Sequence, residues 1–161
     1  MNKKKETNMR KMKFYADATK AGLPFIQIPV DESKGIIMLI DTGANDNIMF
    51  GYAYRELKGM MKEEKSKSYL YGIDGKQTLM NHASGVFSIC GMKYDMIFLI
   101  REDNDAGLKL SEEMGFPVCG IIGTLFMAEH GWMLDFAKQE VIISDADVSW
   151  EELRDSTSYK V

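Results

Sequence analysis

The stretch Ile36-Ile37-Met38-Leu39-Ile40-Asp41-Thr42-Gly43-Ala44 decides the fold of this chain. Five apolar residues lead directly into Asp41, and the apolar run Ile48–Phe50 follows closely. This pattern predicts a buried strand that carries one carboxylate into a tight turn containing glycine. Asp and Gly are ordinary turn formers, so the tripeptide alone is more often a turn than a reactive site.

A second carboxylate is needed before this loop acquires a specific chemistry. Two carboxylates on facing loops can share one proton and activate a water molecule. The sequence contains a single Asp-Thr-Gly. A catalyst of this kind would therefore be a homodimer in which Asp41 of each chain faces its partner.

Composition sets the class of protein. The chain has 161 residues, 45% of them hydrophobic, and a net charge of −4, which fits one globular domain and gives no reason to expect a nucleic-acid partner. No apolar run approaches the roughly 20 residues that span a bilayer, so no membrane partner is expected. The basic N-terminus has no apolar core of a secretory signal, and two cysteines are too few for a disulfide framework. A cytoplasmic location is the simplest expectation.

The cysteines and histidines give no independent sign of a reactive centre. Cys90 and Cys119 stand near predicted strand ends and are expected to be buried structural thiols. His82 and His130 are 48 residues apart, without the spacing of metal ligands. We therefore expect no metal and no cofactor.

Three regions are predicted along the chain. Residues 1–20 are expected to form a basic, mobile tail, residues 21–145 a single domain, and residues 146–161 a C-terminal extension. Within the extension, Ser149-Trp150-Glu151-Glu152 matches a capping box and predicts a short helix.

The domain is predicted to be mostly β, without βαβ alternation. Strand pairs are expected at 25–30 with 36–40, 69–73 with 76–80 across a two-residue Asp74-Gly75 turn, 85–90 with 94–100 across 91–93, and 132–136 with 140–143. Amphipathic spacing predicts a helix over 51–65, and the acidic stretch 101–115 reads as a surface insertion or short helix. A further short helix is expected over 124–130, capped by Thr124 and stopped by Gly131.

The stretch from Leu39 to Asn47 resembles the active-site loop of retropepsin-like aspartic proteases, the half-sized relatives of pepsin. Their second signature, two aliphatic residues and a glycine before a short helix, is matched by Ile121-Ile122-Gly123. The closing strand 131–136 and the hairpin 88–93 also resemble parts of that family, so the resemblance covers residues 24–143 in the right order. The entry hairpin is closer to bacterial single-domain members than to retroviral ones.

This resemblance implies a single-domain pepsin-like β-barrel with one mid-chain helix and one short helix on the C-terminal side. It implies an endopeptidase that cleaves peptides or proteins between large apolar residues with a water held by two Asp41 carboxylates of a homodimer. In the implied site Asp41 is the catalytic residue. Thr42, Gly43 and Ala44 support it within the loop, and Ile121, Ile122 and Gly123 support the loop from behind. The implied substrate-binding residues are Asn45 and, in a hairpin flap, Tyr71, Gly72, Ile73, Asp74 and Gly75.

Two departures leave other functions open. The family often has Asp after the Ala of the loop, paired with Arg after the second signature; this chain has Asn45 and Thr124. Losing both charges together is self-consistent, because one buried charge left alone is costly. The first alternative is a non-catalytic pepsin-fold module that binds a peptide or scaffolds a partner. The second is an inactive monomer with a lone Asp41.

Overall fold

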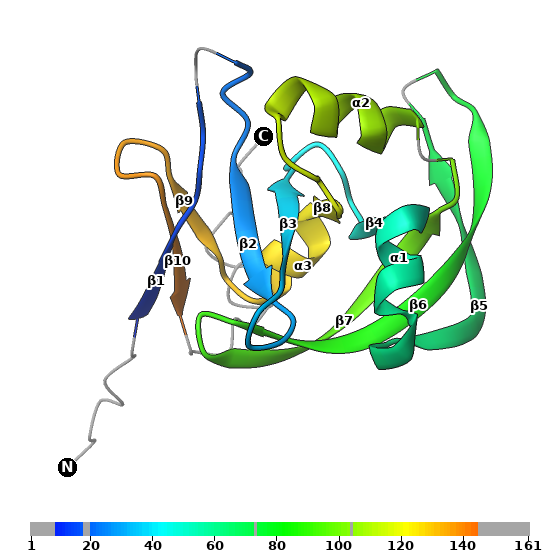
Figure 1. Cartoon of the computed structure of the whole chain (residues 1–161), viewed down its shortest axis with the longest axis horizontal. Coiled ribbons are helices and arrows are strands. Elements are labelled where there is room, and N and C mark those ends of the chain that lie inside the picture. Colours follow the sequence, from blue (N-terminus) through cyan, green and yellow to red (C-terminus); the bar gives the residue numbers. More distant parts are fainter. Residues whose placement is uncertain (1–8, 18–19, 73, 104, 145–161) are drawn as a thin grey trace, which may run out of the picture.

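The computed structural model describes residues 9–17, 20–72, 74–103 and 105–144. Figure 1 shows a three-stranded sheet at one side of the molecule, the β5–β6 hairpin at the other, and the helices between them. The strands are β1 (Met9–Lys13), β2 (Phe25–Pro29), β3 (Gly35–Ile40), β4 (Ile48–Phe50), β5 (Lys62–Tyr71), β6 (Gln77–Ile89), β7 (Met92–Arg101), β8 (Gly120–Ile122), β9 (Met133–Asp135) and β10 (Glu140–Ser144). The helices are α1 (Gly51–Leu57), the 3₁₀ turn η1 (Lys58–Met60), α2 (Asp105–Met114) and α3 (Thr124–Glu129).

The sheet topology places β8 between the two strands that flank the Asp41 loop. The larger sheet has the order β2-β3-β8-β4-β7-β6-β5, and the smaller one β1-β10-β9. β8 pairs in parallel with β3 and antiparallel with β4, so the chain must cross the end of β8 between residues 41 and 47. Over the described residues these are two open sheets, not the closed barrel that the sequence predicted, although the mostly-β class is confirmed.

The core follows from the two-residue period of the long strands. Along β6 and β7, Ala83, Phe87, Met96 and Phe98 point inward and are buried, while the residues between them face the other side of the sheet. The rings of Phe87 and Phe98 meet edge to face, with centroids 5.6 Å apart. This inner face joins the buried residues of β2, β3 and α3 in one cluster, which fixes the sheet that carries the candidate site.

The predicted helix over 51–65 is wrong in its second half. Its helical part ends at Leu57, η1 follows, and β5 begins at Lys62. The cause is the long hairpin: β5 pairs with β6 from Tyr71↔Gln77 down to Lys62↔Ser84. These main-chain hydrogen bonds outweigh the helical preference of the Glu- and Lys-rich segment, because intrinsic propensity is a weak constraint against tertiary pairing.

The predicted mobile tail is wrong for residues 9–13, which form β1. This strand pairs antiparallel with β10, and Phe14 directly after it is buried. Lys11 and Lys13 lie 3.9 and 3.2 Å from the Glu140 carboxylate, so the basic residues of this segment flank a neighbouring acid. The remainder of the tail up to residue 8 and the predicted helix at Ser149 lie outside the described residues.

Two predicted turns differ in position. At the β5–β6 tip, the Gly72 N–H donates to the Lys76 carbonyl and the Gly75 N–H donates to the Gly72 carbonyl, which closes a three-residue loop in place of the predicted two-residue one. Gly75 has φ +76°, the left-handed conformation that such loops require. The β6–β7 turn lies at Cys90–Gly91, one residue earlier than predicted, with Ile89 paired to Met92.

Other predictions are confirmed. The entry hairpin forms as β2–β3 and the last hairpin as β9–β10. The acidic stretch 101–115 contains the helix α2, a third helix beyond the two that the resemblance implied. The short helix α3 is present, and Gly131 follows it with φ +61°. Its N-cap is Gly123, however, and Thr124 is its first residue.

Gly107 allows α2 to pack against β4. A Cβ atom there would lie 2.6–2.8 Å from three ring atoms of Phe50, which is buried. We expect Gly107→Ala to lower the free energy of unfolding by about 1–2 kcal/mol in urea denaturation, because overpacking outweighs the better helix propensity of alanine. At Gly59 a Cβ would meet nothing within 4 Å, so Gly59→Ala is the matched control and should not destabilise. A Gly107→Ala variant as stable as the wild type would contradict this packing.

Candidate active site

Asp41 stands at the end of β3, where that strand leaves its pairing with β8. Leu39 and Ile40 pair with Ile121 and Ile122, and the Asp41 N–H donates to the Ile122 carbonyl at 3.1 Å. The predicted apolar run therefore forms a buried strand that ends at a half-buried carboxylate. Its position is set by the sheet ladder and not by flexible side-chain contacts.

The Asp41 carboxylate is held on one side only. Its Oδ1 accepts the Gly43 N–H at 2.8 Å, and the Asp41 carbonyl accepts the Ala44 N–H at 3.2 Å, which closes the turn. A Cβ at Gly43 would lie 3.1 Å from Oδ1, closer than such atoms ordinarily approach. Within the described residues Oδ2 has no hydrogen-bond partner. One carboxylate oxygen is thus fixed and the other is available for a ligand or a second carboxyl group.

Gly123 is required where β8 meets the loop. A Cβ at this position would lie 2.6 Å from the Asn45 carbonyl oxygen and would also collide with the Asp46 carbonyl. Because these are main-chain atoms, a larger residue would displace the loop. The close approach of the loop main chain to Gly123 therefore has a direct steric basis in the absence of a side chain at that position.

Thr124 ties the loop to α3. Its hydroxyl oxygen lies 2.8 Å from the Thr42 carbonyl oxygen and 3.0 Å from that of Ala44. The main-chain N–H groups of Thr124 and Leu125 donate to the carbonyls of Ala44 and Asn45 at 2.8 and 3.0 Å. The first N–H groups of α3, which have no partner within the helix, thus bind the loop. Asn45 and Thr124 do not pair through their side chains; neutral contacts to main-chain carbonyls hold the loop.

Asn47 is a site residue for which the sequence analysis gave no role. It is the buried polar residue of the described core, 7% exposed. Its Oδ1 accepts the Gly123 N–H at 3.0 Å, and its Nδ2 donates to the Ile97 carbonyl at 3.3 Å. The Leu99 N–H donates to the Asn47 carbonyl at 2.9 Å. Asn47 therefore links the loop to β7. The only sequence signal was an amide directly before an apolar strand.

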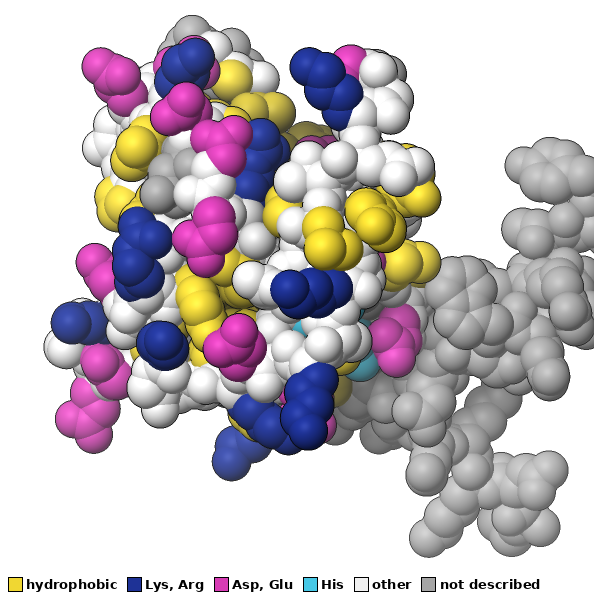
Figure 2. Space-filling model, turned by 90° about the vertical axis from the view of Figure 1, so that its right-hand side faces the viewer, with side chains coloured by type: hydrophobic (Ala, Val, Ile, Leu, Met, Phe, Trp, Pro, Cys, Tyr) yellow, Lys and Arg dark blue, Asp and Glu magenta, His cyan; other side chains and the backbone are white. Residues whose placement is uncertain are grey.

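The predicted flap residues lie at the tip of the β5–β6 hairpin. Tyr71, Gly72, Asp74 and Gly75 surround the tip, and Ile73 lies outside the described residues. Exposed hydrophobic side chains gather on this hairpin, among them Tyr69, Tyr71 and Leu79 with exposed fractions of 51–67%. Figure 2 faces this side of the molecule and shows hydrophobic side chains between Lys, Arg, Asp and Glu.

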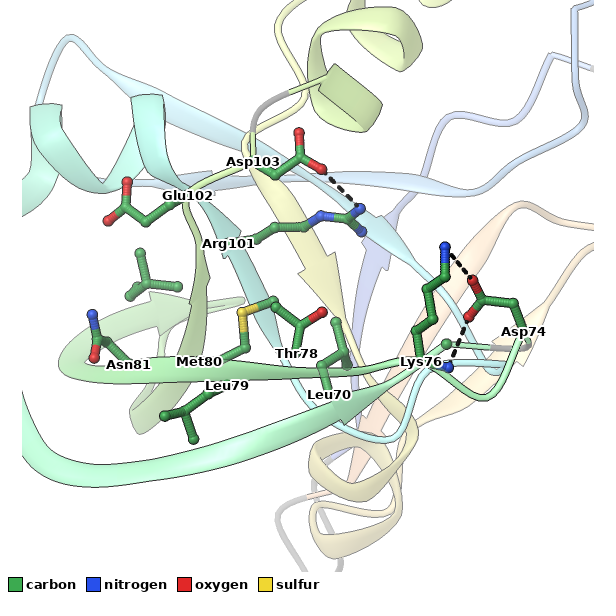
Figure 3. Close-up of a pocket in the computed structure, with 12 residues that line it drawn as sticks. Leu70, Asp74, Lys76, Thr78, Leu79, Met80, Asn81, Arg101, Glu102 and Asp103 are labelled. Atoms are coloured by element: carbon green, nitrogen blue, oxygen red, sulfur yellow. Dashed lines mark hydrogen bonds and ion pairs between the residues drawn. The ribbon is translucent and has the colours of Figure 1, made fainter.

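A pocket of about 460 Å³ lies between the hairpin and the end of β7. Figure 3 shows Arg101 extending across it from β7, with Leu70 and Met80 on the hairpin side and Asp74 and Lys76 at the tip. The ion pairs at its rim join residues two positions apart in sequence: Lys76 lies 3.6 Å from Asp74 and Arg101 3.7 Å from Asp103. Exposed pairs of this kind contribute little stability.

The structure brings some predicted residues together and keeps others apart. Asp41–Asn45 and Ile121–Gly123 form one contiguous unit. The hairpin tip connects to this unit only indirectly, through a cluster in which Met80 and Leu70 pack with Ile48, Leu99 and Ile121. Ile48 and Met49, in the apolar run after the loop, are buried in the core at 4% and 0% exposure and therefore do not line a cleft.

Other reactive groups are poorly placed for chemistry. Cys90 and Cys119 are free and half-buried, less enclosed than predicted. Burial raises the pKa of the Cys119 thiol, so the reactive thiolate is disfavoured at neutral pH. His82 contacts Ser66, with Nδ1 3.1 Å from the hydroxyl oxygen, and the His130 ring packs against Tyr94. Among the described residues no three His, Cys, Asp or Glu side chains are grouped to hold a metal ion. No described helix is long and apolar enough to cross a membrane.

The fold is that of retropepsin-like aspartic proteases. The structure of a retropepsin-like aspartic protease from Rickettsia conorii matches with a TM-score of 0.54 over 89% of this chain and 97% of that one, at 15% identity. The retroviral protease-like domain of Ddi1 from Leishmania major matches with a TM-score of 0.50 over 77% of this chain and 90% of that one, also at 15% identity. No protein-family model and no curated protein sequence matches the chain. The likeness therefore lies in the fold.

The Thr124 hydroxyl should contribute measurably to the stability of the loop. Thr124→Val has nearly the same shape but leaves the Thr42 carbonyl without the partner it has here. We expect it to lower the free energy of unfolding by about 1 kcal/mol and to speed amide exchange at Ala44. Thr124→Ser keeps the hydroxyl and is the control. Equal stability and exchange in the valine variant and the wild type would show that the hydroxyl does not hold the loop.

Proposed function

We propose that this protein is an aspartic endopeptidase in which two Asp41 carboxylates, one from each chain of a homodimer, activate a water molecule. The observation that carries the proposal is the Asp41 carboxylate itself: Oδ1 is fixed by the Gly43 N–H, and Oδ2 has no partner within the described residues. With one carboxylate oxygen fixed at the end of β3 and the other available, Asp41 is suited to bind a second carboxyl group and a water molecule.

The proposed reaction needs only the two carboxyl groups. Because two like charges a few ångströms apart repel each other strongly, the proposed pair holds one proton between its two carboxyl groups. The ionised carboxylate takes a proton from the water, whose oxygen attacks the peptide carbonyl carbon. The protonated carboxyl hydrogen-bonds the carbonyl oxygen as negative charge develops there. Proton transfer to the leaving nitrogen then accompanies cleavage of the C–N bond.

The dimer is part of the proposal because each chain supplies one Asp-Thr-Gly. A two-fold axis between the loops would place both Asp41 side chains in one site. Thr42 is exposed beside Asp41, with its carbonyl held by Thr124, so its side chain is free to contact the partner's loop. Ala44 is half-buried in the same turn and supports its shape.

We propose an extended peptide with large apolar residues as the substrate. Tyr71, Leu79 and the half-buried Leu70 give the hairpin an apolar surface that a substrate side chain can cover. Gly72 and Gly75 flank the tip, where small residues permit the hairpin to bend as substrate enters and leaves. Asn45, exposed in the loop, supplies polar groups to the substrate backbone.

A peptide-binding module without activity is the second candidate. Exposed tyrosines on the hairpin suit a binding surface, because Tyr combines a large apolar area with a polar hydroxyl. The neutral contacts of Thr124 in place of a charged pair also distinguish this loop from the common family pattern. Activity and dimer formation separate the two candidates.

Asp41→Asn tests the chemistry. The substitution keeps the size of the side chain and its acceptor for the Gly43 N–H but removes the ionisable group. We expect cleavage of a responsive peptide to fall by at least about a hundred-fold, with an unchanged circular-dichroism spectrum. Glu32→Gln, in the exposed β2–β3 turn, is the control and should cleave normally. An Asp41→Asn variant that cleaves as fast as the wild type would refute the assignment.

Mixing the two proteins tests the shared site. We assume that chains exchange freely and that a dimer with one intact Asp41 is inactive. In a nine-fold excess of Asp41→Asn, most wild-type chains pair with a variant chain. The mixture should then keep about a tenth of the activity of the same amount of wild type alone. Light scattering checks that the sample is dimeric. Undiminished activity in an exchanging mixture, or an active monomer, would refute a site built from two chains.

A further inference from the structure

A groove of about 440 Å³ lies beside the Asp41 loop, on the face of the β5–β6–β7 sheet that points away from the core. Loop residues 45–47 form one wall, β7 another, and α3 a third. It is a different hollow from the pocket at the hairpin tip. Asn45 and Asp46 belong to the same loop as Asp41, so the groove adjoins the loop that carries the proposed catalytic residue.

Part of the groove is apolar. Ile97 on β7 and Leu125 on α3 line it with exposed fractions of 57% and 55%. Ile97 pairs with Ser84 across the sheet, and its neighbours in sequence, Met96 and Phe98, point into the core. The chain thus places an exposed isoleucine where the strand alternation calls for a polar residue. A ligand with methylene groups would cover this surface favourably.

The charged residues of the groove are acidic. Asp46, Asp95 and Glu129 line it, and all three are exposed. None of them forms an ion pair within the part of the chain that is described, and no lysine or arginine is among the lining residues. The basic group present is the His82 imidazole, which contacts Ser66. By contrast, the carboxylates at the hairpin-tip pocket have cations beside them.

We propose that this groove binds a lysine or arginine side chain of the peptide substrate. The apolar wall would cover the methylene stem and the carboxylates would surround the cationic head, because these side chains bury their stems while the charge stays near water. Negative charge at the groove repels phosphates and acidic peptides, so charge complementarity selects a basic residue. The inference rests on the proposed function: a peptide lying along the loop at Asn45 would reach Asp46 and the groove with a neighbouring side chain.

Paired peptides test the groove. At each position near the scissile bond, a peptide with lysine is compared with one carrying norleucine, which keeps the methylenes and loses the charge. We expect the wild type to prefer lysine at one position, and this kcat/KM ratio to fall about ten-fold in the double variant Asp95→Asn/Glu129→Gln. Raising the salt concentration should reduce the wild-type preference. The control Glu32→Gln/Glu113→Gln removes two exposed carboxylates elsewhere and should leave the ratio unchanged.

A binding measurement separates failure of the groove from failure of the protease. The full chain with Asp41→Asn is titrated against the fluorescent lysine peptide, with and without the two groove substitutions. Cleavage without any lysine preference in the wild type would overturn the groove inference and leave the protease intact. Binding that depends on Asp95 and Glu129, with no cleavage of any peptide by the wild type, would overturn the protease and support the groove. Neither cleavage nor such binding would overturn both.

Discussion

The position of β8 between β3 and β4 is the constraint on which the site depends. Because β3 and β4 both pair with β8, the connecting loop has to pass over the end of that strand. α3 starts at the same point, so its first free N–H groups meet the loop carbonyls of Ala44 and Asn45. Main-chain carbonyl atoms of the loop occupy the space that a side chain at Gly123 would need. Asp41 is therefore oriented by backbone packing, which a surface substitution elsewhere does not disturb.

The loop is braced by neutral groups, and this has an energetic consequence. The Thr124 hydroxyl and the Asn47 amide each satisfy main-chain groups that would otherwise lose hydrogen bonds to water on burial. An ion pair between positions 45 and 124 would carry part of the desolvation cost of a buried pair, because Thr124 is half-buried, and would gain little, because Asn45 is exposed. A neutral brace avoids that cost and adds no formal charge near Asp41.

The sequence predicts the parts of this site that depend on strong local signals. An apolar run ending in Asp-Thr-Gly requires a buried strand and a tight turn, and Ile121-Ile122-Gly123 repeats the signal for the supporting strand. The helix boundary after Leu57 was missed because the segment's spacing suits a helix, whereas long-range pairing with β6 decides its structure. Asn47 was missed for a similar reason: its partners Gly123 and Ile97 are far away in sequence, and nothing local marks the amide as buried.

Core residues and residues of the proposed groove lie on opposite faces of the same strand. On β7, Met96 and Phe98 fill the core, whereas Asp95 and Ile97, which alternate with them, line the groove. An inward change costs packing energy, but an outward one alters only what the surface can bind. The chain accordingly shares its fold with the two matched structures at only 15% identity. In this chain the proposed chemistry depends on the backbone around Asp41, and the proposed choice of substrate depends on outward side chains that the fold leaves unconstrained.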